Sequence, residues 1–207
     1  MSEMNDDPTL LNRDLAPLRI SEIVLKTSHF DTLRQWYQTV FGIKPFYERT
    51  PPKSAVSTYA GGQYVRASDM RLSFMRLHMD FPYTQVLALF EVPSLKRRAP
   101  GEPGLHHMQF RHPSMAELVT RYERLLAIDI KPVRTANHGP GTSFYYMDPD
   151  GNSVELSASN FTTEADYLGY FKSEAYRNNP SGIEIDVTDY VSRFRSGIPL
   201  AQLVRID

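Results

Sequence analysis

The chain of 207 residues contains no cysteine, and its formal net charge is only −1. Disulfides, thiolate nucleophiles and cysteine-ligated metals are therefore excluded, and a metal would have to bind through histidine, carboxylate or tyrosine side chains. The near-zero net charge gives no overall positive field, so we expect neither nucleic acid nor an anionic membrane as a partner. No apolar run approaches the length of a membrane span, and segment 1–14 lacks the apolar core of a signal peptide. We expect a cytoplasmic protein.

Two halves of the sequence repeat the same pattern. An offset of 85 residues aligns Glu22 with His107 and Tyr37 with Tyr122, and Ile43-Lys44-Pro45 then matches a second Ile-Lys-Pro with a shift of two more residues. Each half reads as strand, helix and three strands (βαβββ). Because such a repeat cannot close a core alone, we expect the two copies to pack together.

The fold class predicted from this repeat is α+β, with two tandem βαβββ modules that form a curved, open-barrel cleft and a mainly helical C-terminal extension. The expected organisation is a flexible tail at 1–17, a first module at 18–93, a linker at 94–104, a second module at 105–160 and the extension at 161–207.

The segment 141–156 has the pattern of a β-hairpin. Asp148-Pro149-Asp150-Gly151 is typical turn sequence, since proline presets φ and glycine accepts a left-handed conformation. Side chains alternate between the faces of a strand, so Glu155 should lie opposite the apolar Val154 and Leu156. This pattern predicts a carboxylate on the polar face of the sheet.

The repeat also predicts a metal site. Glu22 and His107 occupy equivalent first strands, and Glu155 on the last strand can meet them in the cleft. Two carboxylates and one imidazole suit Fe(II), Mn(II), Ni(II) or Zn(II). The alternatives are an ion pair for Glu22, a hydrogen-bonded core position for His107 and a surface position for Glu155. His106 should point to the face opposite its neighbour because the two are adjacent in a strand.

The motif from Asn137 to Glu155, which includes His138-Gly139, Ser143-Phe-Tyr145 and Asp148-Pro-Asp-Gly-Asn152, resembles the vicinal oxygen chelate superfamily. This superfamily includes glyoxalase I, fosfomycin-resistance proteins and type I extradiol dioxygenases, and the segment is most similar to single-domain extradiol-dioxygenase-like members. The resemblance covers about residues 18–160 and implies paired βαβββ modules around a metal cleft.

By resemblance, Glu155 and His107 match metal ligands, and Tyr145 matches the active-site tyrosine of ring-cleaving enzymes. His138 matches a histidine that does not bind the metal itself but assists at the site. Two positions depart from the dioxygenase pattern. Glu22 stands where those enzymes usually carry a histidine ligand, and Gln85 stands where their acid–base histidine is expected. His78, on the preceding strand, is a candidate to replace that histidine.

The resemblance implies a metal-dependent, ring-cleaving dioxygenase that acts on a catecholic small molecule, with Fe(II) as the preferred metal and a hydrogen bond donated by Tyr145 to the substrate. A glyoxalase-like isomerase or lyase and a non-catalytic binder, such as a resistance protein, remain alternatives. The extension is expected to form one helix over Thr163–Arg177 and a second over Val187–Arg195. We expect its aromatic residues to stabilise a homodimer.

Overall fold

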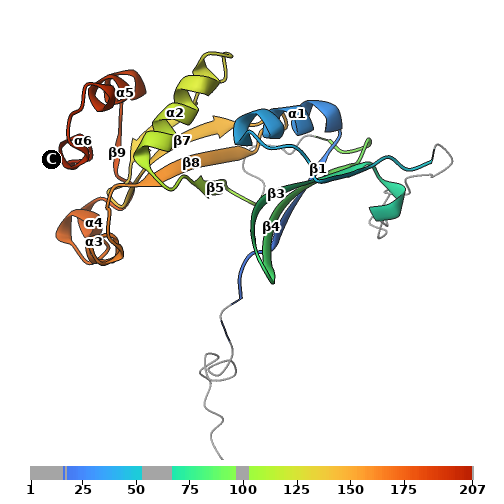
Figure 1. Ribbon diagram of the computed structural model, residues 1–207, viewed down its shortest axis with the longest axis horizontal. Helices are drawn as coiled ribbons and strands as arrows, with labels where there is room; N and C mark the ends of the chain where they lie inside the picture. Colours follow the sequence, from blue (N-terminus) through green and yellow to red (C-terminus); the bar gives the residue numbers. More distant parts are fainter. Residues whose placement is uncertain (1–15, 17, 53–66, 97–102, 207) are drawn as a thin grey trace, which may run out of the picture. The chain divides into compact units, whose positions relative to one another are not determined.

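The computed structural model describes residues 16, 18–52, 67–96 and 103–206, and these form two compact units (Figure 1). The first unit contains the described residues of 1–26 and 43–92, and the second those of 27–42 and 93–207. Each unit has one sheet, and helices are found together with these sheets, so the predicted α+β class is confirmed. Nearly all of the predicted tail and the centre of the predicted linker lie outside the described residues. No helix within the described ranges has the length and apolar character needed to cross a membrane.

The first unit contains a four-stranded sheet with the strand order β1-β4-β3-β2. The strands are β1 (Glu22–Thr27), β2 (Tyr47–Arg49), β3 (Leu72–Asp80) and β4 (Tyr83–Glu91), preceded at β3 by a short 3-10 turn at Ala67–Asp69. Its core is formed by buried apolar side chains of three strands, among them Leu25, Leu72, Met75, Leu87 and Leu89.

The second unit contains a five-stranded sheet with the order β5-β8-β7-β6-β9. Its elements are β5 (Met108–Arg111), α2 (Met115–Leu126), β6 (Arg134–Asn137), β7 (Gly141–Met147), β8 (Ser153–Ser159) and β9 (Ile183–Glu184). Figure 1 shows α2 lying across β7 and β8, where Tyr122 packs against Phe144. Apart from β9, the strand order β5-β8-β7-β6 corresponds to the order β1-β4-β3-β2 of the first sheet. Along the chain, a helix follows the first strand in both halves, which confirms the predicted βαβββ repeat.

Helix α1 (Phe30–Phe41) belongs to the second unit, although it follows the first strand of the chain. Phe41 packs against Phe110 with ring centroids 4.6 Å apart. Gly42 ends the helix at a φ of 67°, where a side chain would be strained. The module boundaries expected from the sequence place this helix in the first module and stay a prediction.

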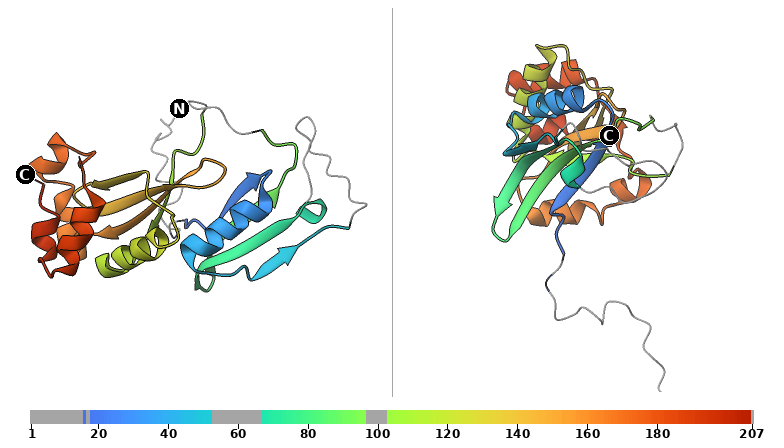
Figure 2. Two further views of the ribbon diagram at one scale, coloured as in Figure 1. Left: turned by 90° about the horizontal axis from the view of Figure 1, so that it is seen from above. Right: turned by 90° about the vertical axis from the view of Figure 1, so that its right-hand side faces the viewer.

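The C-terminal extension is mainly helical, as predicted, but the single helix expected at Thr163–Arg177 is wrong. It is split into α3 (Glu164–Tyr170) and α4 (Glu174–Asn178), and is followed by α5 (Val187–Arg195) and α6 (Leu200–Leu203). Ser173 causes the break, because its hydroxyl donates to the Tyr170 carbonyl and accepts the Tyr176 N–H that begins α4. Figure 2 shows these helices gathered at one end of the second sheet.

Candidate metal and substrate site

The β7–β8 hairpin places Glu155 on the polar face of the second sheet, as predicted. Glu155 lies directly opposite Tyr145 on β7 and opposite Gln109 on β5. Val154 and Leu156 point to the other face and are fully buried. The register therefore gathers polar side chains from three strands in one row.

Glu155 is buried, with only 2% of its surface exposed. One carboxylate oxygen, Oε2, lies 3.0 Å from His107 Nε2. The other, Oε1, accepts hydrogen bonds from Ser143 Oγ at 2.5 Å and from Gln109 Nε2 at 2.7 Å. The surface position considered for Glu155 is therefore excluded. A buried carboxylate is costly without polar partners, and these three contacts give both of its oxygen atoms at least one.

His107 lies one residue before β5, so the strand alternation expected for His106 does not apply. The Nδ1 atoms of the two rings are 2.7 Å apart and the ring centroids 5.0 Å apart. The prediction that His106 faces the opposite side is therefore wrong, because the backbone is not extended into a paired strand at these two residues. His106 lies beside His107 at the edge of the site.

Tyr145 and His138 form a second polar pair on the same face. The Tyr145 hydroxyl lies 2.8 Å from His138 Nε2, and the tyrosine ring is 5.9 Å from the His107 ring. Burial, together with the negative charge of Glu155, raises the pKa of Tyr145 to about 12. The phenol therefore keeps its proton throughout the physiological range.

This raised pKa predicts that the Tyr145→Phe variant loses one phenol that titrates at unusually high pH. The neutral phenol is favoured in the folded protein, so its contribution to stability is present below pH 10 and is lost as the pH rises to about 12. In a phenolate absorbance titration of the metal-free protein, the variant should lack one group that titrates near pH 12. Loss of a group with an ordinary pKa near 10 would contradict this assignment.

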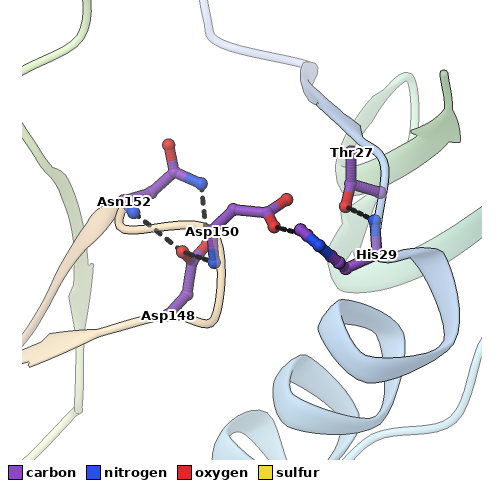
Figure 3. A network of polar contacts seen from close by, with 5 residues as sticks. All are labelled: Thr27, His29, Asp148, Asp150 and Asn152. Carbon is purple, nitrogen blue, oxygen red and sulfur yellow. Dashed lines mark hydrogen bonds and ion pairs between the residues drawn. The ribbon is translucent and has the colours of Figure 1, made fainter. Parts of the chain in front are cut away.

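The turn of the hairpin is held by Asp148, a buried carboxylate (Figure 3). Its Oδ1 accepts the backbone N–H groups of Asp150 at 3.0 Å and Asn152 at 2.7 Å. Its Oδ2 accepts the Asn152 amide at 2.8 Å and the Tyr37 hydroxyl of α1, also at 2.8 Å. In the same turn, Asp150 Oδ1 lies 2.9 Å from Nδ1 of His29, the residue just before α1. This part of the sequence motif therefore joins the hairpin to α1.

Three other predicted residues lie in the first unit. Glu22 opens β1 and is exposed, and its role as a metal ligand stays a prediction. His78 on β3 lies opposite Gln85 on β4, next to an irregularity in the strand pairing, and both are exposed. Among the described residues, no three histidine or carboxylate side chains form a ready metal site.

Sequence reasoning missed several residues around Glu155. Gln109 and Ser143 bind its carboxylate, and Ser157, on the same face, has a buried hydroxyl that contacts no partner. Arg134 of β6 lies 5.2 Å from the centroid of the Tyr145 ring and pairs with Glu184 of β9 at 2.9 Å. Period-2 alternation around Glu155 predicts the faces of Ser143 and Ser157, whereas Gln109 and Arg134 depend on pairing between distant strands.

Comparisons with known proteins agree with this architecture. The model of the Glyoxalase/Bleomycin resistance protein/Dioxygenase superfamily matches residues 19–156. Biphenyl-2,3-diol 1,2-dioxygenase 2 of Rhodococcus globerulus is 30% identical over 185 residues, which cover 89% of this chain and 86% of that protein. Biphenyl-2,3-diol 1,2-dioxygenase 3 of the same organism is 30% identical over 187 residues with the same two coverages.

Among solved structures, a glyoxylase/bleomycin resistance protein/dioxygenase domain from Frankia sp. EAN1pec has the same fold. It is 18% identical, with a TM-score of 0.52, over 70% of this chain and 99% of that chain. The resemblance inferred from the Asn137–Glu155 motif is confirmed. The chain belongs to the Glyoxalase/Bleomycin resistance protein/Dioxygenase superfamily.

Proposed function

We propose that this protein is a metal-dependent, extradiol-type dioxygenase that opens the ring of a catecholic substrate. The observation that carries the proposal is the buried Glu155 carboxylate, which faces His107 and lies on the same sheet face as the Tyr145–His138 pair. The two Rhodococcus globerulus relatives, both biphenyl-2,3-diol dioxygenases, favour this reaction over other chemistry of the superfamily.

The side chains at the site fit a divalent metal. An imidazole nitrogen and a carboxylate oxygen lie 3.0 Å apart and are ligand types that Fe(II), Mn(II) and Zn(II) accept. We propose His107, Glu155 and Glu22 as the ligands, with Fe(II) as the metal. Gln109 and Ser143 would keep Glu155 oriented, as outer hydrogen bonds do in metal centres. When bound, the metal supplies Lewis acidity and a place for two adjacent oxygen atoms of the substrate.

The protein groups around the His107 and Glu155 side chains can form hydrogen bonds with a diol. Tyr145 is a protonated phenol beside His138, so it can form a hydrogen bond with a substrate hydroxyl. The Ser157 hydroxyl is buried on the same face and has no hydrogen-bond partner among the described residues. Ring opening breaks a carbon–carbon bond beside the diol and adds both atoms of dioxygen, so the catechol supplies all the electrons.

Metal analysis and oxygen uptake test this proposal together. The purified full-length protein should bind one Fe(II) per chain and then consume oxygen with catechol or biphenyl-2,3-diol. If no divalent metal binds after anaerobic addition of Fe(II), Mn(II) or Ni(II), the metal proposal fails. If metal binds but no catechol supports oxygen uptake, the dioxygenase proposal fails, and a non-redox reaction of the glyoxalase type becomes the better reading.

The Glu22→Ala variant tests the third ligand. We expect its Fe(II) affinity to fall at least about tenfold, since removal even of groups that only support a ligand typically costs ~10–100-fold. Glu48→Ala is a matched control, because Glu48 is also an exposed strand glutamate of the first unit. Equal affinities in the two variants would show that Glu22 is not a ligand. Fe(II) binding is measured anaerobically by equilibrium titration.

A further inference from the structure

The C-terminal extension reaches the candidate site through the ring of His138. On one side of the ring, Nδ1 lies 2.7 Å from the backbone carbonyl oxygen of Ser181. On the other side, Nε2 lies 2.8 Å from the Tyr145 hydroxyl. The imidazole therefore connects a tyrosine of β7 with a turn that lies outside the βαβββ repeat.

The chemistry of these two contacts determines where the protons lie. A carbonyl oxygen can only accept a hydrogen bond, so His138 Nδ1 must donate to Ser181. In a neutral imidazole, Nε2 then carries no proton and accepts one from the Tyr145 hydroxyl. The phenol proton is thus directed to His138, and the phenol oxygen keeps a lone pair that can accept another hydrogen bond.

The Ser181 carbonyl is held in place by a tight turn at residues 179–182. The Gly182 N–H donates to the Asn179 carbonyl at 3.2 Å, and the Asn179 amide donates back to the Gly182 carbonyl at 2.9 Å. Gly182 has a φ of +72°, and a Cβ there would lie 2.0 Å from the Asn137 carbonyl oxygen and 2.5 Å from His138 Cα. Only glycine allows the turn to lie directly on the backbone of His138.

The segment on both sides of His138 is fixed to the extension as well. Asn137 pairs with Ile183 of β9, and its side-chain amide donates to the Val204 carbonyl at 2.7 Å. Gly139 lies so close to Tyr170 of α3 that a Cβ would come within 2.3 Å of the tyrosine ring. The position of the imidazole therefore depends on the extension and not on β6 and β7 alone.

We propose that the 179–182 turn is a positioning element of the site, which holds His138 protonated at Nδ1 so that Tyr145 donates to His138 and accepts a hydrogen bond from a substrate hydroxyl. This reverses the donor role towards the substrate that the sequence resemblance implied for Tyr145. The role towards a substrate hydroxyl rests on the proposed function, whereas the proton position on His138 does not.

Nitrogen NMR of the histidine rings in the metal-free, full-length protein tests the first part. His138, assigned by its loss in His138→Asn, should show a protonated Nδ1 and an unprotonated Nε2. Tyr145→Phe should shift the Nε2 resonance and leave Nδ1 protonated, because only the donor to Nε2 is removed. A proton on Nε2 of the neutral ring in the unaltered protein would overturn the proposal.

Two glycine variants test the role of the turn. Gly182→Ala should give His138 a mixture of both protonated forms and weaken anaerobic catechol binding to the Fe(II)-loaded protein about tenfold, equivalent to one hydrogen bond. Gly197→Ala is the control, since Gly197 has a φ of +84° in the same extension but a Cβ there would meet no atom of the described residues within 4 Å. The control should change neither measurement, and equal effects in the two variants would overturn the proposal.

The outcomes separate this proposal from the proposed function. If catechol does not bind to the unaltered protein while His138 carries its proton on Nδ1, the proposed function fails and the positioning role of the turn stands. If Gly182→Ala does not fold, the spectra of the unaltered protein and of Tyr145→Phe still decide the position of the proton.

Discussion

Replacing Glu155 by glutamine should reduce Fe(II) affinity at least about 100-fold, because the substitution removes the charged ligand oxygen. The fold should survive. Glutamine keeps the same shape, its carbonyl oxygen can accept from Ser143 and Gln109, and its amide can donate to His107 Nε2. Equilibrium Fe(II) titration under anaerobic conditions measures the effect.

The stability of the metal-free Glu155→Gln variant should be unchanged or about 1 kcal/mol higher, since a buried charge with only 2% exposure is replaced by a neutral group. Glu117→Gln serves as the control, because Glu117 is exposed on α2 in the same unit. Metal affinity should be unaltered in that control. Retained Fe(II) affinity in Glu155→Gln would show that Glu155 is a structural acid rather than a ligand.

The Asp148→Ala variant should lose about 3–5 kcal/mol of folding stability, because several hydrogen bonds to one buried carboxylate disappear together. Two of them fix the hairpin turn, and the bond from Tyr37 holds α1 against it. Tyr37 is itself fully buried, so its hydroxyl would be left without a partner. Trp36, the single tryptophan of the chain, is next to Tyr37 and reports α1 docking by fluorescence during urea unfolding.

Asp150→Ala is the matched control in the same turn. Among the residues that the structure describes, its side chain pairs with the exposed His29 alone, so the loss should stay below about 1 kcal/mol. Tyr37→Phe should cost about 1–2 kcal/mol, and combining it with Asp148→Ala should cost less than the sum of the two single variants, since they share one hydrogen bond. Equal, small losses for Asp148→Ala and Asp150→Ala would contradict the role assigned to Asp148.

Much of the fold could be predicted from local patterns. The strand alternation around Glu155 gave its face correctly, and the proline–glycine turn before it gave the hairpin. These features depend on neighbours along the chain, which sequence shows directly. Helix α1 illustrates the limit: its apolar stripe of Leu33, Tyr37 and Val40 predicts a buried face but is the same whichever sheet the helix covers.

The polar partners of the site were harder to predict. Gln109 reaches Glu155 because β5 and β8 pair in parallel, 46 residues apart, and nothing local sets that register. Strand β9 is only two residues long, too short for a periodic signal, yet it brings Ser181 to His138. His106 was placed on the wrong face because the strand begins after it. The motif thus predicted the candidate ligands more readily than the groups that orient them.

The fate of labelled dioxygen tests the central claim most directly. The Fe(II)-loaded, full-length protein is supplied with biphenyl-2,3-diol and isotopically heavy dioxygen, and the product is analysed by mass spectrometry. The account predicts a ring-opened product that contains both heavy oxygen atoms, and the Glu155→Gln variant should form none. An unopened ring, or a product without heavy oxygen from protein that binds Fe(II), would contradict the account.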